Sequence, residues 1–147
     1  MTITEQEVAE ICVQTMLASD QAVRNLGLTV DQVAAGHVTV SMLVTENLLN
    51  GFGTCHGGYI FTLADCAFAF ACNSRNQMTV GQHCSITYVN PARRNDRLTA
   101  VAKEISQQGR SGLYDVRISN QDGLIVAEFR GHSRIFGGQL ASHVDWA

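Results

Sequence analysis

One carboxylate lies in the middle of the most apolar stretch of this sequence. Asp65 is the only charged residue from Gly57 up to Arg75. Apolar residues on every side of a segment predict a helix that is buried all round. Burial of an isolated carboxylate is costly or forces it to take up a proton, so Asp65 needs a reason to be there. General-base or nucleophilic chemistry is one reason, and a carboxylate neutralised by burial or paired with a polar neighbour is the other.

The glycine pair at the start of the same segment is the second feature with chemical potential. The first turn of a helix supplies N–H groups without partners and a positive dipole end, which suit an oxyanion. Gly57 and Gly58 have no side chains, so a substrate can approach their backbone closely. The alternative is a plain glycine turn before a helix. Asn50 can either orient an attacking water or serve as an ordinary loop asparagine, since its amide both donates and accepts.

The spacing of these groups restricts how they can act together. Asp65 follows Gly57 by eight residues, which is about 12 Å along a helix axis at about 1.5 Å per residue. One reacting carbon cannot lie within about 3 Å of both groups. The base and the oxyanion donor of one reaction should therefore come from different helices, as two antiparallel helices across a dimer axis would provide.

The elements around this segment predict an antiparallel sheet that encloses the helix. The length of 147 residues and 46% hydrophobic content fit one domain, residues 1–147. Helical spacing predicts an opening helix within residues 1–24, and residues 137–147 carry no period and are expected to form a loose tail. Alternation and turn signals place strands at residues 26–35, 37–44, 80–89 and 97–107, and a last pair around Asp122-Gly123. Strands joined by short turns give an α+β class with an antiparallel sheet.

Composition excludes several classes of protein. A net charge of −3 argues against nucleic-acid and anionic-membrane surfaces, which require a basic excess. The acidic start lacks the apolar region of a signal peptide, so a cytoplasmic location is expected. Residues 59–72 are too few to span a membrane and carry Asp65 in their middle. The five scattered cysteines suggest neither disulfides nor a zinc site, and His56 and Asp65 lack further metal ligands at a useful spacing.

Four motifs together resemble a known family. Asn50, Cys55-His56-Gly57-Gly58, Leu63-Ala64-Asp65 and the strand from Ile86 to Pro91 resemble the hotdog-fold acyl-CoA thioesterases, most closely the phenylacetic acid degradation thioesterase (PaaI) branch. The likeness covers about residues 20 to 136. It implies the hotdog fold, in which a long central helix is wrapped by a curved antiparallel β-sheet. It also implies a homodimer with shared active sites and a homotetramer of such dimers.

The resemblance also implies roles for individual residues. Asp65 would be the general base or nucleophile, and the Gly57 backbone N–H would polarise the thioester carbonyl. Asn50 would orient the water or the thioester, and His56 would have a structural or substrate-shaping role. Some relatives carry a serine or threonine early in the strand after the helix. This chain has Val80-Gly81-Gln82 at that place, with Thr79 and Ser85 nearby.

An aryl-acyl-CoA such as phenylacetyl-CoA or its ring-hydroxylated form is the expected substrate. The aromatic residues of the central helix offer flat walls for a ring, although they are first of all core residues. Coenzyme A would be part of the substrate, and no cofactor or metal is expected. The expected substrate-binding residues are Gly58, Tyr59, Arg93, Arg94, Arg110 and Ser111, the arginines either pairing with phosphates or remaining solvated. The alternative function is a non-catalytic acyl-CoA or acyl-carrier binding module, and the intact set of Asn50, Gly57 and Asp65 favours the enzyme.

Overall fold

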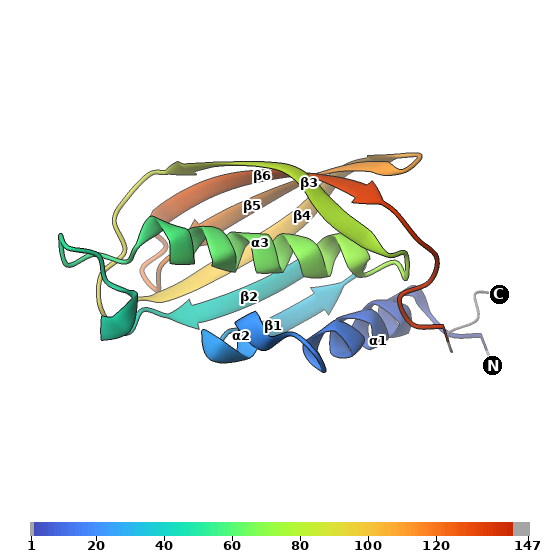
Figure 1. Cartoon of the computed structure of the whole chain (residues 1–147), viewed down its shortest axis with the longest axis horizontal. Coiled ribbons are helices and arrows are strands. Elements are labelled where there is room, and N and C mark those ends of the chain that lie inside the picture. Colours follow the sequence, from blue (N-terminus) through green and yellow to red (C-terminus); the bar gives the residue numbers. More distant parts are fainter. Residues whose placement is uncertain (1, 143–147) are drawn as a thin grey trace.

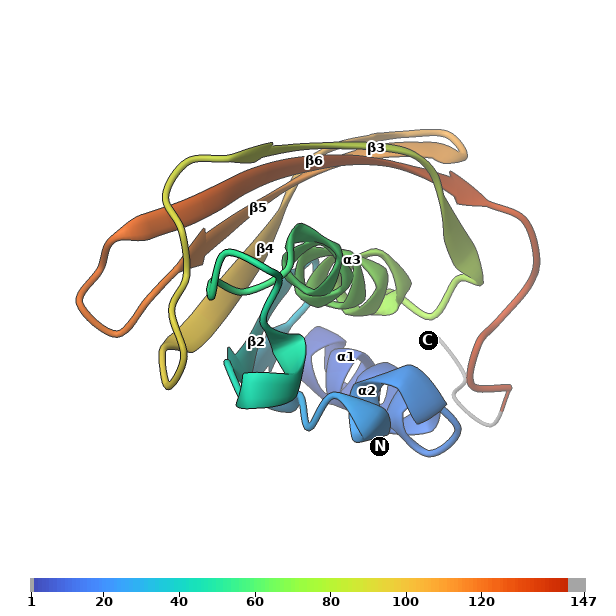
Figure 2. The same cartoon turned by 60° about the vertical axis from the view of Figure 1, so that its left-hand side comes forward.

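A curved antiparallel sheet wraps around one long helix in the computed structural model, which describes residues 2–142. Figures 1 and 2 show the sheet arching over helix α3, Gly57–Asn73, with two further helices beside its β1–β2 end. The six strands lie in the order β1-β2-β4-β5-β6-β3. Their bounds are Thr29–Ala34 for β1, His37–Leu43 for β2, Thr79–Tyr88 for β3, Arg97–Gln108 for β4, Ser111–Ser119 for β5 and Ile125–Ile135 for β6.

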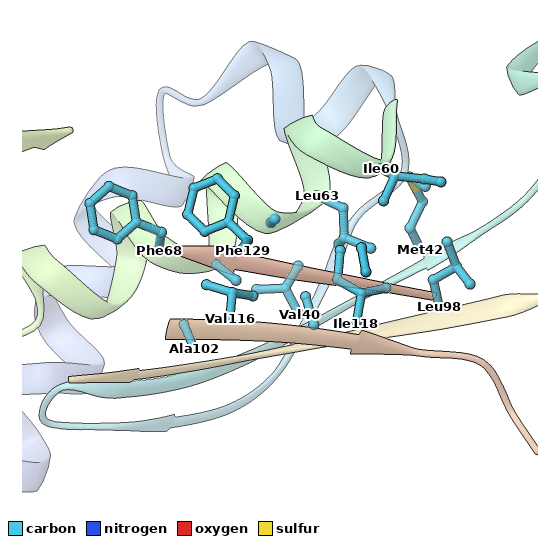
Figure 3. Packing of buried hydrophobic residues seen from close by; sticks show 14 of the residues in the cluster. Val40, Met42, Ile60, Leu63, Phe68, Leu98, Ala102, Val116, Ile118 and Phe129 are labelled. Atoms are coloured by element: carbon cyan, nitrogen blue, oxygen red, sulfur yellow. The ribbon is translucent and has the colours of Figure 1, made fainter. Parts of the chain in front are cut away.

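The core lies between the inner face of the sheet and α3. Alternate residues of the strands point inward because successive side chains of a strand face opposite sides. Figure 3 shows Ile60, Leu63 and Phe68 of α3 in the same cluster as inward residues of four strands. Those strand residues are Val40, Met42, Leu98, Ala102, Val116, Ile118 and Phe129, all of them buried. Removing this apolar surface from water, at about 25 cal/mol per Å², holds the helix in the hollow of the sheet.

Helix α3 has the predicted bounds but is not buried on every side. Leu63, Ala64 and Phe68 are buried against the sheet. A second stripe, which includes Thr62 and Asp65, is only half-buried in the single chain. The prediction of burial all round is thus wrong for one copy of the chain, because the sheet and the N-terminal helices cover only part of the helix surface.

The N-terminal segment forms two helices instead of the single predicted one. Helix α1, Glu5–Leu17, begins at a capping box between Thr4 and Glu7, and helix α2 spans Gln21–Asn25. The Asp20 side chain accepts a hydrogen bond from the Val23 N–H at 3.1 Å, which starts α2. The strand expected from residue 26 begins only at residue 29, since Leu26 ends α2 and Gly27 follows with a φ of +64°.

The first residues of the predicted loose tail are anchored to the body of the protein. Ala141 is buried, and its N–H donates to the Asn76 side chain at 2.7 Å. The Asn76 amide donates in return to the Ala141 carbonyl at 3.2 Å. The prediction is therefore wrong for residues 137–142, and its remainder, residues 143–147, lies outside the described residues. Within residues 2–142, no helix is both long and apolar enough to cross a membrane.

Candidate active site

The first turn of α3 leaves one backbone amide free. His56 is the N-cap, and its Nδ1 accepts the Gly58 N–H at 3.0 Å. The Tyr59 and Ile60 N–H groups donate to the His56 carbonyl at 3.0 and 3.3 Å. Among residues 2–142, no acceptor meets the Gly57 N–H. The Gly57 N–H is therefore free to act as the predicted oxyanion donor, whereas the Gly58 N–H is already bonded to the His56 cap.

Tyr88 fixes the Gly57 backbone from the end of β3. Its hydroxyl donates to the Gly57 carbonyl at 2.9 Å. Its ring is so close that a Cβ on Gly57 would stand 3.0 Å from the ring Cζ. A side chain on Gly57 would therefore require the Tyr88 ring to shift. The sequence analysis did not single out Tyr88, although alternation places it on the same face of the strand as Cys84 and Ile86.

An open cleft of about 330 Å³ lies beside the free amide. Residues from the loop before α3, from its first turn and from the end of β3 line it: Asn50, Thr54, Cys55, Gly57, Ile60, Tyr88, Val89, Asn90 and Pro91. A larger hollow of about 530 Å³ lies on α1, and neither Gly57 nor Asp65 lines it. The chemistry therefore points to the smaller cleft, which brings the predicted Asn50 and Gly57 together.

Asn50 organises the loop that forms one side of the cleft. Its Oδ1 accepts the N–H groups of Phe52 and Thr54 at 2.9 and 3.2 Å, and its Nδ2 donates to the Thr54 hydroxyl at 3.1 Å. These are the bonds of an asparagine that closes a tight loop. In the single chain, Asn50 is thus a structural residue that also lines the cleft.

Asp65 lies two turns further along α3, away from Gly57. Its carboxylate is half-buried and has no hydrogen bond or ion pair with any residue of the described chain. Burial raises the pKa of this carboxyl above its ordinary value. Pairing with a polar neighbour therefore does not explain Asp65 in the described chain. The two explanations left from the sequence are a carboxyl neutralised by burial and a carboxylate that acts as a base. The two groups stay about 12 Å apart along one helix, by the rise of about 1.5 Å per residue.

The predicted coenzyme A residues fall at two ends of the molecule. Arg93 pairs with Thr54 in an isolated β-bridge, and Arg94 forms an exposed ion pair with Glu46 at 3.5 Å, so both lie near the loop before α3. Arg110 and Ser111 lie at the turn that joins β4 to β5. The twelve residues of β4 separate the two groups, about 40 Å at about 3.3 Å per residue. One chain does not bring them together.

The remaining predicted residues lie around these elements. The Tyr59 side chain is 36% exposed, and its ring makes an edge contact with His56 at a centroid distance of 6.1 Å. Thr79 is buried and donates its hydroxyl to the Gln77 carbonyl at 2.7 Å. Ser85 is exposed on β3, opposite Arg130 of β6. Neither hydroxyl lines the cleft of a single chain.

The described residues offer no obvious place for a metal ion. Across residues 2–142, no three or more His, Cys, Asp and Glu side chains gather closely enough to hold one. Burial raises the pKa of the Cys55 thiol, the one thiol in the cleft, to about 11. A thiol with such a pKa stays protonated at neutral pH and makes a poor nucleophile.

The fold and the free helix amide define a hotdog enzyme of the thioesterase class, and sequence comparison agrees. The model of the thioesterase superfamily matches residues 52–127, and the chain belongs to this family. The predictions of a hotdog fold and of a thioester hydrolase are thereby confirmed.

Individual relatives are similar over most of the chain. Acyl-coenzyme A thioesterase PaaI of Escherichia coli (strain K12) is 41% identical over 125 residues, which are 85% of this chain and 89% of that protein. The solved structure of E. coli PaaI, from the phenylacetic acid degradation operon, superposes with a TM-score of 0.91 at 38% identity, covering 92% of this chain and 99% of that one. A hypothetical thioesterase of Streptococcus pneumoniae TIGR4, solved with coenzyme A, gives a TM-score of 0.74 at 29% identity and covers 76% and 88%.

Proposed function

We propose that this protein hydrolyses the thioester of an aryl-acyl-CoA, such as phenylacetyl-CoA or a ring-hydroxylated form. The observation that carries the proposal is the Gly57 N–H, which has no partner among the described residues and lies at the cleft. Such a donor suits the oxygen of a thioester carbonyl, on which negative charge develops during attack. The name of the E. coli relative and the coenzyme A in the S. pneumoniae structure support the choice of acyl-CoA.

The reaction needs the groups of two chains. The Gly57 N–H of one chain polarises the carbonyl, and Asp65 of a second copy either removes a proton from the attacking water or attacks the carbon itself. In the first route, the C–S bond breaks as the acid forms, and the proton held by Asp65 passes to the departing sulfur. A carboxyl whose pKa is raised by burial holds that proton better than an ordinary one. In the second route, an Asp65 oxygen displaces the coenzyme A thiolate to form a mixed anhydride, and water then hydrolyses the anhydride to the acid and free Asp65, a proton passing to the thiolate.

An antiparallel pairing of two β3 strands would assemble this site. β3 lies at one edge of the sheet, so one of its sides has no strand beside it. Tyr88 of β3 contacts Gly57, and Gly81 lies against Phe68, so β3 and α3 run in opposite directions alongside each other. A two-fold axis between the two β3 strands, perpendicular to them, then makes the two α3 helices antiparallel, which brings Asp65 of one copy toward Gly57 of the other.

The same pairing would reunite the separated coenzyme A residues. Val80 pairs with Arg134, and Arg134 pairs with Ser111, so the β4–β5 turn lies at the Thr79 end of β3. Antiparallel pairing sets this end beside the Tyr88 end of the other copy. Arg110 and Ser111 of one chain would therefore approach the cleft that holds Gly57 in the other. The homotetramer and the cytoplasmic location stay predictions from the sequence.

The walls of the cleft favour a short, flat acyl group. Tyr88 and Ile60 offer apolar surface, and the buried Cys55 limits one side of the cleft. A ring that contacts an aromatic wall gains about 0.5 to 1.5 kcal/mol, whereas a long flexible chain loses more rotamer entropy than a rigid ring when it is ordered against the walls of the cleft. These properties support an aryl substrate over a long-chain one.

Specificity constants on phenylacetyl-, hexanoyl- and palmitoyl-CoA, followed by release of free thiol, test the proposal. We expect phenylacetyl-CoA to exceed palmitoyl-CoA by about tenfold, which corresponds to about 1.4 kcal/mol of transition-state discrimination. A preference for palmitoyl-CoA would refute the aryl assignment and leave a thioesterase. Binding of acyl-CoA without any thiol release would favour the alternative, a non-catalytic acyl-CoA or acyl-carrier binding module.

A further inference from the structure

The cleft contains one side-chain oxygen that no group of the described chain satisfies. The Asn90 amide nitrogen donates to the Ile125 carbonyl at 2.8 Å, and its backbone N–H lies 3.3 Å from the Val126 carbonyl. A carbonyl oxygen can only accept, so the Asn90 atom that bonds the Ile125 carbonyl is the amide nitrogen. The other amide atom, Oδ1, is left unpaired. Asn90 is half-buried, and within residues 2–142 its Oδ1 enters no hydrogen bond.

The other polar side chains of the cleft are already engaged. The Asn50 amide and the Thr54 hydroxyl bond each other and the loop, and the Tyr88 hydroxyl bonds the Gly57 carbonyl. The described cleft residues therefore present a free donor, the Gly57 N–H, and one side-chain oxygen without a bond, Asn90 Oδ1. Asn90 follows Tyr88 by two residues, which is about 7 Å along an extended chain.

We infer that Asn90 is a specificity-determining residue that accepts a hydrogen bond from an O–H or N–H group of the bound substrate. This inference rests on the proposed function, because the substrate carbonyl is taken to lie at the Gly57 N–H. The matching donor is either a hydroxyl on the aryl ring or an amide N–H of the pantetheine arm. A site built to hydrogen-bond a substrate group discriminates strongly against an analogue that lacks the group.

A hydrogen bond within the protein already holds the Asn90 side chain in place for binding a substrate donor. Its nitrogen is tied to Ile125, at the start of β6, so the orientation of the oxygen is fixed before a substrate arrives. A fixed acceptor loses little conformational entropy on binding. An aspartate at this position keeps an acceptor oxygen but loses the anchoring donor, whereas an alanine loses both.

The test compares Asn90→Ala and Asn90→Asp with the unchanged protein on three thioesters. These are phenylacetyl-CoA, 4-hydroxyphenylacetyl-CoA, and the phenylacetyl thioester of mercaptoethanesulfonate, which has no pantetheine amide. Asn47→Ala, which changes an exposed asparagine outside the cleft, is the control. Ratios of kcat/KM within one variant cancel any loss of folded protein. If a ring hydroxyl is the donor, Asn90→Ala lowers the ratio of hydroxylated to plain substrate by about tenfold, and Asn90→Asp, which keeps an acceptor oxygen but loses the anchor, lowers it less.

The remaining outcomes identify the other donor or overturn the inference. Equal losses on both CoA esters, without loss on the mercaptoethanesulfonate ester, identify a pantetheine amide as the donor. Equal losses of kcat/KM on all three esters mean that Asn90 only holds the backbone through Ile125, and this result overturns the inference. Unchanged kcat/KM values on all three esters overturn it as well. If the unchanged protein hydrolyses only non-aryl acyl-CoA, the proposed aryl function fails. The test for a pantetheine donor then compares the CoA ester and the mercaptoethanesulfonate ester of the acyl group that the protein does hydrolyse.

Discussion

The ring of Phe68 occupies the space that a side chain on Gly131 would need. A Cβ built on Gly131 would stand 2.7 Å from the Cε2 and Cζ atoms of this ring. Gly81, on the neighbouring strand β3, meets the same ring, since its Cβ would stand 3.0 Å from Cε1. The two glycines allow α3 to lie close under β3 and β6.

Gly131→Ala is expected to destabilise the protein by about 1 to 3 kcal/mol, because an added methyl group would push the Phe68 ring into a packed core. Denaturant unfolding at fixed protein concentration measures the change. Gly138→Ala is the matched control, since no atom lies within 4 Å of a Cβ built there. Equal stability of the two variants would show that the core relaxes around the methyl group at no cost.

Asp65→Asn is expected to lower turnover by at least about a hundredfold, the usual scale for loss of a positioned base. Asparagine is close in size, so the fold should survive. Burial raises the pKa of the carboxyl, so the native state holds the proton more tightly than the unfolded chain does. The stability of the native state therefore falls as the pH rises from the ordinary aspartate pKa to the raised one. At neutral pH, Asp65→Asn should therefore unfold at a higher denaturant concentration than the unchanged protein. Full activity of the folded variant would remove Asp65 from the mechanism.

The pH profile of kcat/KM should carry the signature of the same carboxyl. The base works when ionised, so activity falls as pH decreases through the pKa of Asp65. Since burial raises this pKa, the acidic limb should lie at a higher pH than for an ordinary aspartate. Thiol release measured between about pH 4 and 8 locates the limb. An acidic limb at the pKa of an ordinary aspartate would contradict the claim that burial raises the pKa of Asp65.

Two inactive variants should restore activity when mixed. Gly57→Val places a side chain against the Tyr88 ring and disturbs the free amide, whereas Asp65→Asn removes the base. After unfolding and refolding together in equal amounts, hybrid dimers hold one intact site, so about a quarter of normal activity should return. Each variant refolded alone is the control. A mixture as inactive as its components, or a fully active monomer in light scattering, would place both groups in one chain.

Local features of the fold were predictable because they depend on neighbouring residues. The bounds of α3 follow from its apolar run and glycine start, and the turns that separate the later strands follow from glycine-containing dipeptides such as Asp122-Gly123. The opening helix was predicted as one piece, because helical spacing continues through the break. The Asp20 cap, which a sequence signal could have revealed, divides it in two.

The spatial arrangement of the site was less predictable, because periodicity does not give the order of strands in a sheet. Alternation identifies β3 as a strand but does not say that it pairs with β6 at an edge. The length of β4 separates Arg93 from Arg110 in one chain. The place of β3 beside α3 puts Tyr88 against Gly57. The free Asn90 oxygen also depends on a contact with the distant Ile125.

The position of β6 between β5 and β3 has a consequence for synthesis on the ribosome. β3 is made before β4, β5 and β6, yet within residues 2–142 its one neighbour in the sheet is the last strand, Ile125–Ile135. Until these residues have left the exit tunnel, β3 has no ladder to join, and the Tyr88 contact to Gly57 has no support. Such long-range pairing is slow to form and exposes strand edges meanwhile. A nascent chain that stalls before β6 therefore presents an unpaired β3 strand and a helix that β6 does not yet cover, and exposed strand edges and apolar surface favour aggregation.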